Sequence, residues 1–268
     1  MQASIFLDQT DYSGKEILIG LSGGINSMAV LCWLANYPQW YKPKVLHLFY
    51  AHFEEHSPDT LDFVLAGVKY AETRFEKVVY NQTNNSVIEF FEGKKMIPHP
   101  MVAPCTMVLK VEPMLEYMVV NKITIDLVGY VRSEKRRIDR MAGRSESKKV
   151  KNNAVNIKGI DKHFPISDKD NQWCFDIVKR EIGWYPKIYD IKRNGKRVFH
   201  HNNCLPCKNM NLKDFALVKK YYPEYWQKAQ DLADRLNLYW GRSKQDFYTT
   251  FGRKYQQDGQ TCSICAFD

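Results

Sequence analysis

The feature that most constrains the fold is a glycine-rich turn that joins a short apolar run to a helical pattern. Residues 16–21 read EILIGL, and the sequence Ser22-Gly23-Gly24-Ile25-Asn26-Ser27 follows directly. Apolar residues then recur at helical spacing over residues 27–35. This order predicts a strand, a tight loop and a helix, because paired glycines allow the backbone to turn sharply.

Apolar runs and helical patterns alternate through the rest of the first half. The predicted strands span residues 44–53, 77–80 and 125–130, and the predicted helices span residues 60–75, 87–92 and 106–120. Pro113 is expected to lie in the first turns of the last helix or to kink it. Alternating strands and helices predict a parallel sheet with right-handed crossovers, which binds ligands at the carboxyl ends of its strands.

The second half of the chain is predicted to be mainly helical, most clearly over residues 171–182 and 211–236. A chain of 268 residues with 44% hydrophobic residues can bury a full core. We therefore expect an α/β protein with a nucleotide-binding parallel-sheet domain over residues 1–166. Residues 167–268 are expected to form a smaller helical subdomain that bears cysteines.

The sequence contains no apolar run of the length that spans a membrane, and its first ten residues lack the basic-then-apolar order of a signal peptide. These features predict a soluble, cytoplasmic protein without a membrane partner.

The positive charge of the chain is concentrated in one stretch. The formal net charge is +9, and residues 132–162 contain 11 Lys or Arg against 4 Asp or Glu. An anionic partner, either a nucleotide or a nucleic-acid backbone, is one interpretation of this stretch. The other is a solvated basic loop. Because apolar residues are sparse over residues 132–156, we expect a loop there that is mobile or ordered by a partner.

Four of the seven cysteines form two C-x-x-C pairs. These pairs are Cys204 with Cys207 and Cys262 with Cys265. Four thiolates in paired turns are typical of a tetrahedral zinc site or a four-iron, four-sulfur cluster, and the spacing does not distinguish the two. His200 and His201 lie near the first pair as substitute ligands. Unligated cysteines or a redox pair are the alternative.

The glycine-rich loop has the properties of a phosphate-binding site. A helix that starts at such a loop points unpaired N–H groups at an anion, and the hydroxyls of Ser22 and Ser27 can donate to phosphate oxygens. The loop lacks the Gly-Lys-Ser/Thr of the P-loop in kinases and GTPases. An ordinary glycine turn between a strand and a helix is the alternative.

The loop resembles the PP-loop of the adenine nucleotide alpha-hydrolase superfamily, whose usual form is Ser-Gly-Gly-x-Asp-Ser. The resemblance implies a Rossmann-like (HUP) fold, with ATP and Mg²⁺ as ligands. It also implies cleavage between the alpha and beta phosphates or binding of an adenylylated substrate. The sequence departs from this form at Asn26, where the acid usually stands. An asparagine cannot give a magnesium ion a full negative charge, which affects hydrolysis more than nucleotide binding.

Two further segments resemble the phosphoadenylyl-sulfate (PAPS) reductase branch of that superfamily. They read CTMVLKVEPMLEYM from Cys105 and GYVRSEKRRIDR from Gly129. With the loop, the resemblance implies a nucleotide-binding set of Ser22, Gly23, Gly24, Asn26, Ser27, Gly129, Arg132 and Arg137. It also implies Cys105, Lys110 and Asn26 as catalytic candidates.

The residues of these segments suit anion binding. Arg132 and Arg137 follow a predicted strand end, where guanidinium groups can bind a sulfate or phosphate bidentately, and Lys110 can add a point charge. Glu134 is expected to orient an arginine. The alternative for the arginines is simple surface solvation. Cys105 is either a thiolate nucleophile or persulfide carrier, or a small buried residue.

Three functions remain open from the sequence. The first is a PP-loop enzyme that uses ATP to adenylylate or sulfurate a target, with a nucleic acid as a candidate target and a sulfur-donor protein as a candidate partner. The second is a PAPS or adenylyl-sulfate reductase-like enzyme, which the tail disfavours because it lacks the Glu-Cys-Gly-x-His element of such reductases. The third is a non-catalytic nucleotide-binding protein.

Overall fold

The structure is a computed structural model, and it describes residues 10–97, 104–141, 159–207, 210 and 212–236. The strands are β1 (Glu16–Leu21), β2 (Val45–Phe53), β3 (Val78–Asn85), β4 (Ile125–Leu127), β5 (Asp161–His163), β6 (Lys192–Arg193) and β7 (Lys196–Arg197). The α-helices are α1 (Ile25–Ala35), α2 (Thr60–Glu72), α3 (Val87–Gly93), α4 (Glu112–Val120), α5 (Lys135–Met141), α6 (Asn171–Glu181), α7 (Leu212–Tyr221) and α8 (Pro223–Arg235).

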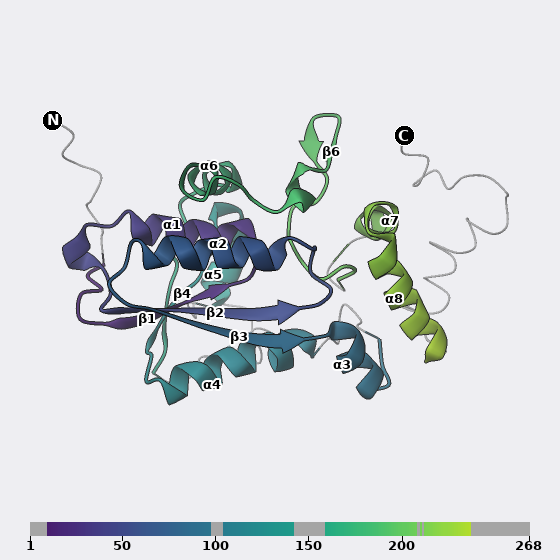
Figure 1. The fold of residues 1–268 in the computed structure, drawn as a ribbon, viewed down its shortest axis with the longest axis horizontal. Helices are drawn as coiled ribbons and strands as arrows, with labels where there is room; N and C mark the ends of the chain where they lie inside the picture. Colours follow the sequence, from purple (N-terminus) through teal and green to yellow (C-terminus); the bar gives the residue numbers. More distant parts are fainter. Residues whose placement is uncertain (1–9, 98–103, 142–158, 208–209, 211, 237–268) are drawn as a thin grey trace. The chain divides into compact units, whose positions relative to one another are not determined.

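Five strands form a parallel sheet in the order β3-β2-β1-β4-β5 (Figure 1). The central strand β1 pairs with β2 and β4, so that Ile17 lies opposite Leu46 on one side and Ile125 on the other. The chain starts at the middle of the sheet, moves outward to β3, and returns to the other side of β1. The fold is therefore a Rossmann-like α/β fold with a parallel sheet, as the alternation of strands and helices predicts.

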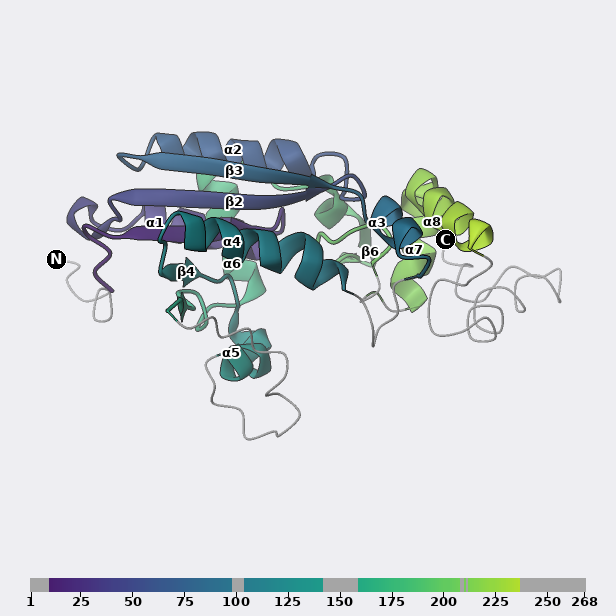
Figure 2. The same cartoon turned by 90° about the horizontal axis from the view of Figure 1, so that it is seen from below.

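Helices cover both faces of this sheet. Figures 1 and 2 show α1 and α2 on one face and α4 on the other. Nine of the eleven residues of α1 are buried, which explains its almost continuous apolar sequence. On the opposite face, Tyr117 of α4 hydrogen-bonds to His47 at 2.9 Å and packs against the ring of Phe49.

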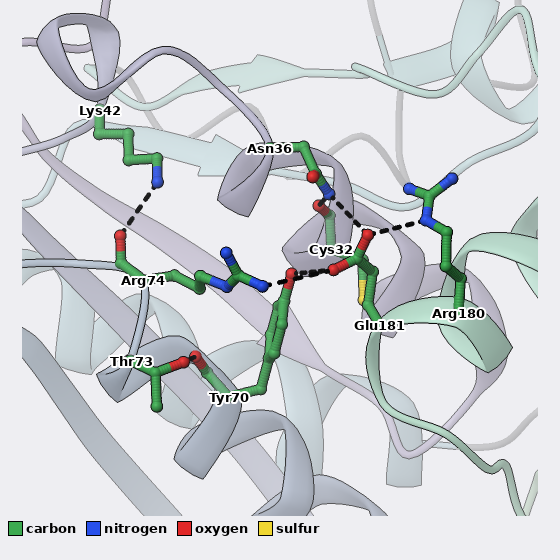
Figure 3. A network of polar contacts seen from close by, with 8 residues as sticks. All are labelled: Cys32, Asn36, Lys42, Tyr70, Thr73, Arg74, Arg180 and Glu181. Carbon is green, nitrogen blue, oxygen red and sulfur yellow. Dashed lines mark hydrogen bonds and ion pairs between the residues drawn. The ribbon is translucent and has the colours of Figure 1, made fainter.

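A polar network connects three helices of the sheet unit, α1, α2 and α6 (Figure 3). The carboxylate of Glu181, at the end of α6, accepts hydrogen bonds from the Tyr70 hydroxyl at 2.7 Å and from Asn36 at 3.2 Å. Arg180 donates to the same carboxylate at 2.9 Å, and Arg74 lies 3.8 Å away. Glu181 therefore joins α6 to α1 and α2 through one largely buried side chain.

The structure differs from the sequence predictions in and after the basic stretch. Residues 132–141, expected to be a loop, form a single 3₁₀ turn followed by α5. Side-chain pairs one turn apart support this helix, since Lys135 contacts Asp139 at 2.7 Å and Arg137 contacts Glu134. β5 was not predicted, because Asp-Lys-His is a short polar sequence that only an edge strand accommodates.

Pro113 shapes the helix that contains it. Residues Met107–Val111 form a π-helical segment directly before α4. A proline has no N–H to donate to the carbonyl one turn earlier, and its ring clashes with that carbonyl. The wider turn before Pro113 accommodates both effects, which is the local distortion that the sequence predicts.

The contacts within the chain define two compact units. The sheet unit comprises Met1–Tyr50, Asp59–Gln82 and Met114–Pro186, and the cysteine unit comprises Ala51–Pro58, Thr83–Pro113 and Lys187–Asp268. Each unit consists of three separate segments of the sequence, whereas a boundary at residue 166 would divide the chain only once. The predicted boundary between residues 1–166 and 167–268 stays a prediction.

Among the helices that the structure describes, none is both long and apolar enough to cross a membrane.

Candidate functional site

The predicted phosphate loop lies between the end of β1 and the start of α1, in the sheet unit. Gly23 has a φ of 74°, a left-handed conformation that favours glycine. Gly24 caps the helix in an extended conformation, and no side chain hydrogen-bonds to this helix end as a cap. The loop therefore places the start of α1 at the carboxyl end of the central strand, and this helix start has no side-chain cap.

The two serine hydroxyls hold the loop in shape. Ser27 Oγ accepts a hydrogen bond from the Ser22 backbone N–H at 3.0 Å and lies 3.1 Å from Ser22 Oγ. Ser27 Oγ also donates to the Gly24 carbonyl at 3.1 Å. Because Ser27 is buried and Ser22 is exposed, Ser27 closes the loop, whereas Ser22 is the hydroxyl positioned at the surface.

Asn26 gives the start of α1 its electrostatic character. The first turn of this helix contains no acidic residue, so the partial positive charge of the helix end has no carboxylate beside it. The Oδ1 atom of Asn26 is buried and has no hydrogen-bond partner among the described residues. A neutral side chain at this position leaves the loop suited to an anion and poorly suited to a magnesium ion.

Gly129 supports the loop from the next strand. It follows β4, and a β-carbon at this position would lie 2.8 Å from the carbonyl oxygen of Asn26 and 3.0 Å from the nitrogen of Ser27. Real β-carbons do not approach backbone atoms this closely. Gly129 therefore allows the segment after β4 to pack against the phosphate loop, and its contact is with the loop backbone.

The two arginines predicted to bind a second anion both have partners within the chain. Arg132 donates from Nε to the Asp168 carbonyl at 3.1 Å, and a second nitrogen of its guanidinium donates to the same oxygen. Arg137 pairs with Glu134 and lies over the Tyr130 ring at 4.8 Å. Both arginines are exposed, and Glu134 orients Arg137 as the sequence suggested.

Cys105 and Lys110 lie in the cysteine unit, on either side of the start of the π-helical segment. Cys105 is a half-buried free thiol that packs against the apolar cluster around Phe53 and Phe91. The Lys110 ammonium lies 4.7 Å from the centre of the Phe53 ring, in a cation–π contact. π-helical turns are frequent at functional sites, and this one contains Lys110.

The described half of the cysteine pairs is in the same cluster. Cys204 is buried within it, and Cys207 is half-buried. The pKa of the Cys204 thiol is raised to about 12, mainly by burial. The Lys110 ammonium acts to lower this pKa, whereas Cys207, Glu55 and Cys105 act to raise it. Cys105 packs against the same cluster that contains Cys204, a relationship that the sequence spacing did not suggest.

A metal site is not complete in the described part of the chain. Among the described residues, no group of three or more His, Cys, Asp or Glu side chains is arranged to hold a metal ion. Cys262 and Cys265 lie outside the described residues. His200 and His201 are exposed. The four-cysteine site stays a prediction.

A buried polar group that the sequence did not predict lies beside these cysteines. Glu55 is 4% exposed, and its carboxylate accepts hydrogen bonds from Ser86 Oγ at 2.7 Å and Val87 N at 2.9 Å, at the start of α3. Its backbone carbonyl accepts from Leu205 N at 2.7 Å. Glu55 thus caps α3 and fixes the backbone next to Cys204. The sequence signal for Glu55 was its position directly after the buried strand β2, where the carboxyl ends of parallel strands carry functional side chains.

Comparison with known proteins gives structural matches only. No protein-family model matches the sequence, and no curated protein matches it. The U34-tRNA thiolase NcsA from Methanococcus maripaludis, solved with its 4Fe-4S cluster, is similar over 96% of this chain and 82% of its own, with 14% identity and a TM-score of 0.47.

Two other solved structures are similar to the chain. PAPS reductase from Candida auris, in a phosphate complex, matches over 65% of this chain and 76% of its own, with 16% identity and a TM-score of 0.41. NMN synthetase from Francisella tularensis matches over 94% of this chain and 90% of its own, with 12% identity and a TM-score of 0.41.

Proposed function

We propose that the chain is an adenine-nucleotide enzyme whose Ser22–Ser27 loop binds the phosphates of ATP and activates or sulfurates a target. The observation that carries the proposal is the geometry of the loop: a left-handed Gly23, a helix end without a side-chain cap, and the exposed Ser22 hydroxyl at the carboxyl end of the central strand. Helix N–H groups and a hydroxyl are the donors that phosphate oxygens accept from.

The chemistry follows from holding the phosphates in this way. A nucleophilic oxygen of the target attacks the alpha phosphorus of ATP, pyrophosphate leaves, and the target carries AMP. A sulfide-level sulfur donor can then displace AMP, which leaves with the oxygen. The loop contributes by stabilising the charge on the phosphate oxygens, since fixed N–H groups need no reorganisation as the charge develops. Cys105 and Lys110 are the proposed catalytic residues of the cysteine unit.

A metal would serve this unit through cysteine thiolates. The residues present fit in part: Cys204 and Cys207 provide two thiols at a buried position, and the rest of the proposed set, Cys262 and Cys265, lies outside the described residues. Zinc or an iron–sulfur cluster would require these thiols as thiolates, and burial of Cys204 opposes ionisation unless a metal binds.

The metal proposal is tested by stoichiometry rather than activity. Zinc and iron are measured per chain in the wild type, in Cys204→Ala, in Cys262→Ala and in Cys105→Ala. Loss of metal in the first two variants but not in the third supports the four-cysteine set. Loss of metal in Cys105→Ala with retention in Cys262→Ala would contradict this set. A wild-type chain without either metal would contradict the metal proposal as a whole.

Asn26 favours a second candidate function, a nucleotide-binding protein that does not cleave ATP. The loop has no carboxylate in the first turn of α1, so it does not offer a magnesium ion a full negative charge. The PAPS reductase-like alternative has less support, because Arg132 and Arg137 already contact the Asp168 carbonyl and Glu134.

Incubation with ATP labelled at the alpha phosphate separates these functions. The proposed function predicts labelled AMP, or labelled AMP attached to a target, together with pyrophosphate. Bound but uncleaved ATP would support the non-catalytic candidate. Release of labelled ADP would contradict the proposal, because cleavage would then occur between the beta and gamma phosphates.

A further inference from the structure

The cysteine unit contains a basic β-hairpin. Strands β6 and β7 pair antiparallel as a separate two-stranded sheet, visible at the β6 label in Figure 1. Asn194 and Gly195 connect them, with φ values of 49° and 73°. Two consecutive residues with positive φ are the signature of a type I′ turn, which matches the twist of a tight hairpin.

All four residues of the paired strands are cationic. Lys192 lies opposite Arg197, and Arg193 lies opposite Lys196. Like charges directly opposite each other destabilise an antiparallel pair. The two like-charge pairs therefore oppose the pairing of the strands. Residues 187–201 contain five Lys or Arg against one acid, Asp190.

The charges at the hairpin are available to a partner. Lys192 and Lys196 are exposed, and neither forms an ion pair with any residue that the structure describes. The hairpin thus presents two ammonium groups to solvent, one on each of its faces, because paired residues share a face and successive residues alternate between faces. Evenly spaced anions are the partner that such a feature fits, because each would relieve the repulsion between opposite strands.

The hairpin is connected to a second basic and aromatic feature of the same unit. Phe199, which follows β7, packs edge-on against Tyr222 at 6.1 Å between ring centres, where α7 meets α8. Lys219, Lys220 and Tyr221 are exposed at this end of α7, and Tyr221 is 40% exposed. An exposed aromatic ring among cations is the combination that proteins use to stack an unpaired base beside a phosphate backbone.

We propose that the β6–β7 hairpin and the end of α7 bind a single-stranded nucleic acid, which is the target of the activation reaction. This inference rests on the proposed function for the identity of the reaction, and on the hairpin for the identity of the target. Lys192 and Lys196 contact backbone phosphates, and Tyr221 stacks on an unpaired base. The basic stretch over residues 132–162 is not required for this contact.

The proposal is tested by fluorescence anisotropy with the full chain and labelled single-stranded RNA or DNA of mixed sequence. Lys192→Glu/Lys196→Glu should weaken binding by about tenfold or more and make the slope of log affinity against log salt shallower by about 1.4. The matched control is Lys69→Glu/Lys77→Glu, which changes the net charge equally at two exposed positions of the sheet unit. The control should bind as the wild type does in both respects.

Two further variants separate the geometry from the charge. Asn194→Ala/Gly195→Ala keeps every cation but removes the residues that adopt positive φ, and it should also weaken binding. Tyr221→Ala should weaken binding to single strands by about tenfold while binding to duplex DNA changes little, because only unpaired bases can stack. Melting temperatures confirm that each variant is folded.

The remaining outcomes contradict the proposal in distinct ways. If the Lys192/Lys196 variant and the control bind alike, net charge alone attracts the nucleic acid. If polyglutamate competes as well as RNA does, the partner is an acidic protein. Calorimetry with ATP on the same variant separates this inference from the proposed function: ATP binding with no nucleic-acid binding removes only the hairpin proposal, whereas nucleic-acid binding without ATP binding removes the proposed function.

Discussion

The α-carbon of Gly129 lies so close to the backbone of Asn26 that an added methyl group would be 2.8 Å from the Asn26 carbonyl oxygen. Because the neighbouring atoms are backbone, they cannot rotate away as a side chain would. We predict that Gly129→Ala displaces the phosphate loop, lowers the free energy of unfolding by about 1–3 kcal/mol, and weakens ATP binding. Urea denaturation and calorimetry measure the two effects.

Gly93→Ala is the matched control for this prediction. A methyl group at Gly93 meets no atom within 4 Å, and this glycine ends helix α3 without a positive φ. Its stability should stay within about 0.5 kcal/mol of the wild type or rise slightly. Equal behaviour of the two alanine variants would show that Gly129 does not support the loop.

The neutral side chain of Asn26 sets how the loop responds to magnesium. Asn26→Asp would place a carboxylate in the first turn of α1, next to the phosphates in the proposed complex. We expect ATP affinity measured in EDTA to fall by about fivefold in the variant, because two negative charges then lie close together. Added magnesium should restore it. An affinity that is equal to that of the wild type with and without magnesium would place the phosphates elsewhere.

Lys162 compensates a buried charge in the sheet. Its ammonium lies 3.6 Å from Asp126, which is 3% exposed, and burial raises the pKa of Asp126 while Lys162 lowers it. Lys162→Met should lower the free energy of unfolding at pH 7 by about 3–5 kcal/mol, since it leaves a buried carboxylate alone.

The double variant Asp126→Asn/Lys162→Met checks this explanation. It should recover most of the loss, and the deficit of the single variant should shrink at acidic pH, where Asp126 is protonated. A deficit that is equal at pH 5 and pH 7, with no recovery in the double variant, would mean that the lysine stem and not its charge is needed.

Glu181 should make the helix packing sensitive to acid. Burial raises the pKa of this carboxyl, but the hydrogen bonds from Tyr70, Arg180 and Asn36 outweigh burial and hold the pKa below the usual 4.5. Its contribution to stability is therefore present above the unfolded-state pKa and is lost as the pH falls through the lower folded-state pKa.

Comparison of Glu181→Gln with the wild type measures this contribution. At pH 7 the variant should be less stable by about 1–2 kcal/mol, because hydrogen bonds to a charged group are exchanged for bonds to a neutral one. The difference should disappear below the folded-state pKa. A difference that persists there would assign the effect to packing of the side chain.

The sequence predicted the centre of the sheet well because most residues of β1 and β2 are buried. The apolar runs of β1 and β2 and the helical spacing of α1 and α2 follow from burial on both faces, and the loop between β1 and α1 has a clear glycine signal. The structure places Gly129 against that loop, a contact that no periodicity in the sequence could show.

The missed features depend on polar sequences or on contacts distant in the sequence. β5 is short and polar, and its position is set by pairing with β4. The β6–β7 hairpin had a signal in Asn194-Gly195, which was outweighed by the helical expectation for the second half. The association of Cys105 with Cys204 joins residues about one hundred positions apart, so sequence spacing could not reveal it.

Calorimetric titration of ATP into the wild type and Gly24→Val tests directly whether the Ser22–Ser27 loop binds an adenine nucleotide. Gly24 has an extended backbone, with φ −91° and ψ 163°, which a valine can adopt, so the variant adds bulk at the helix end without backbone strain. One ATP should bind per chain of the wild type. The variant should show no measurable binding and should melt at an unchanged temperature. Equal affinity in the two proteins, or no binding by the wild type, would contradict nucleotide binding by this loop.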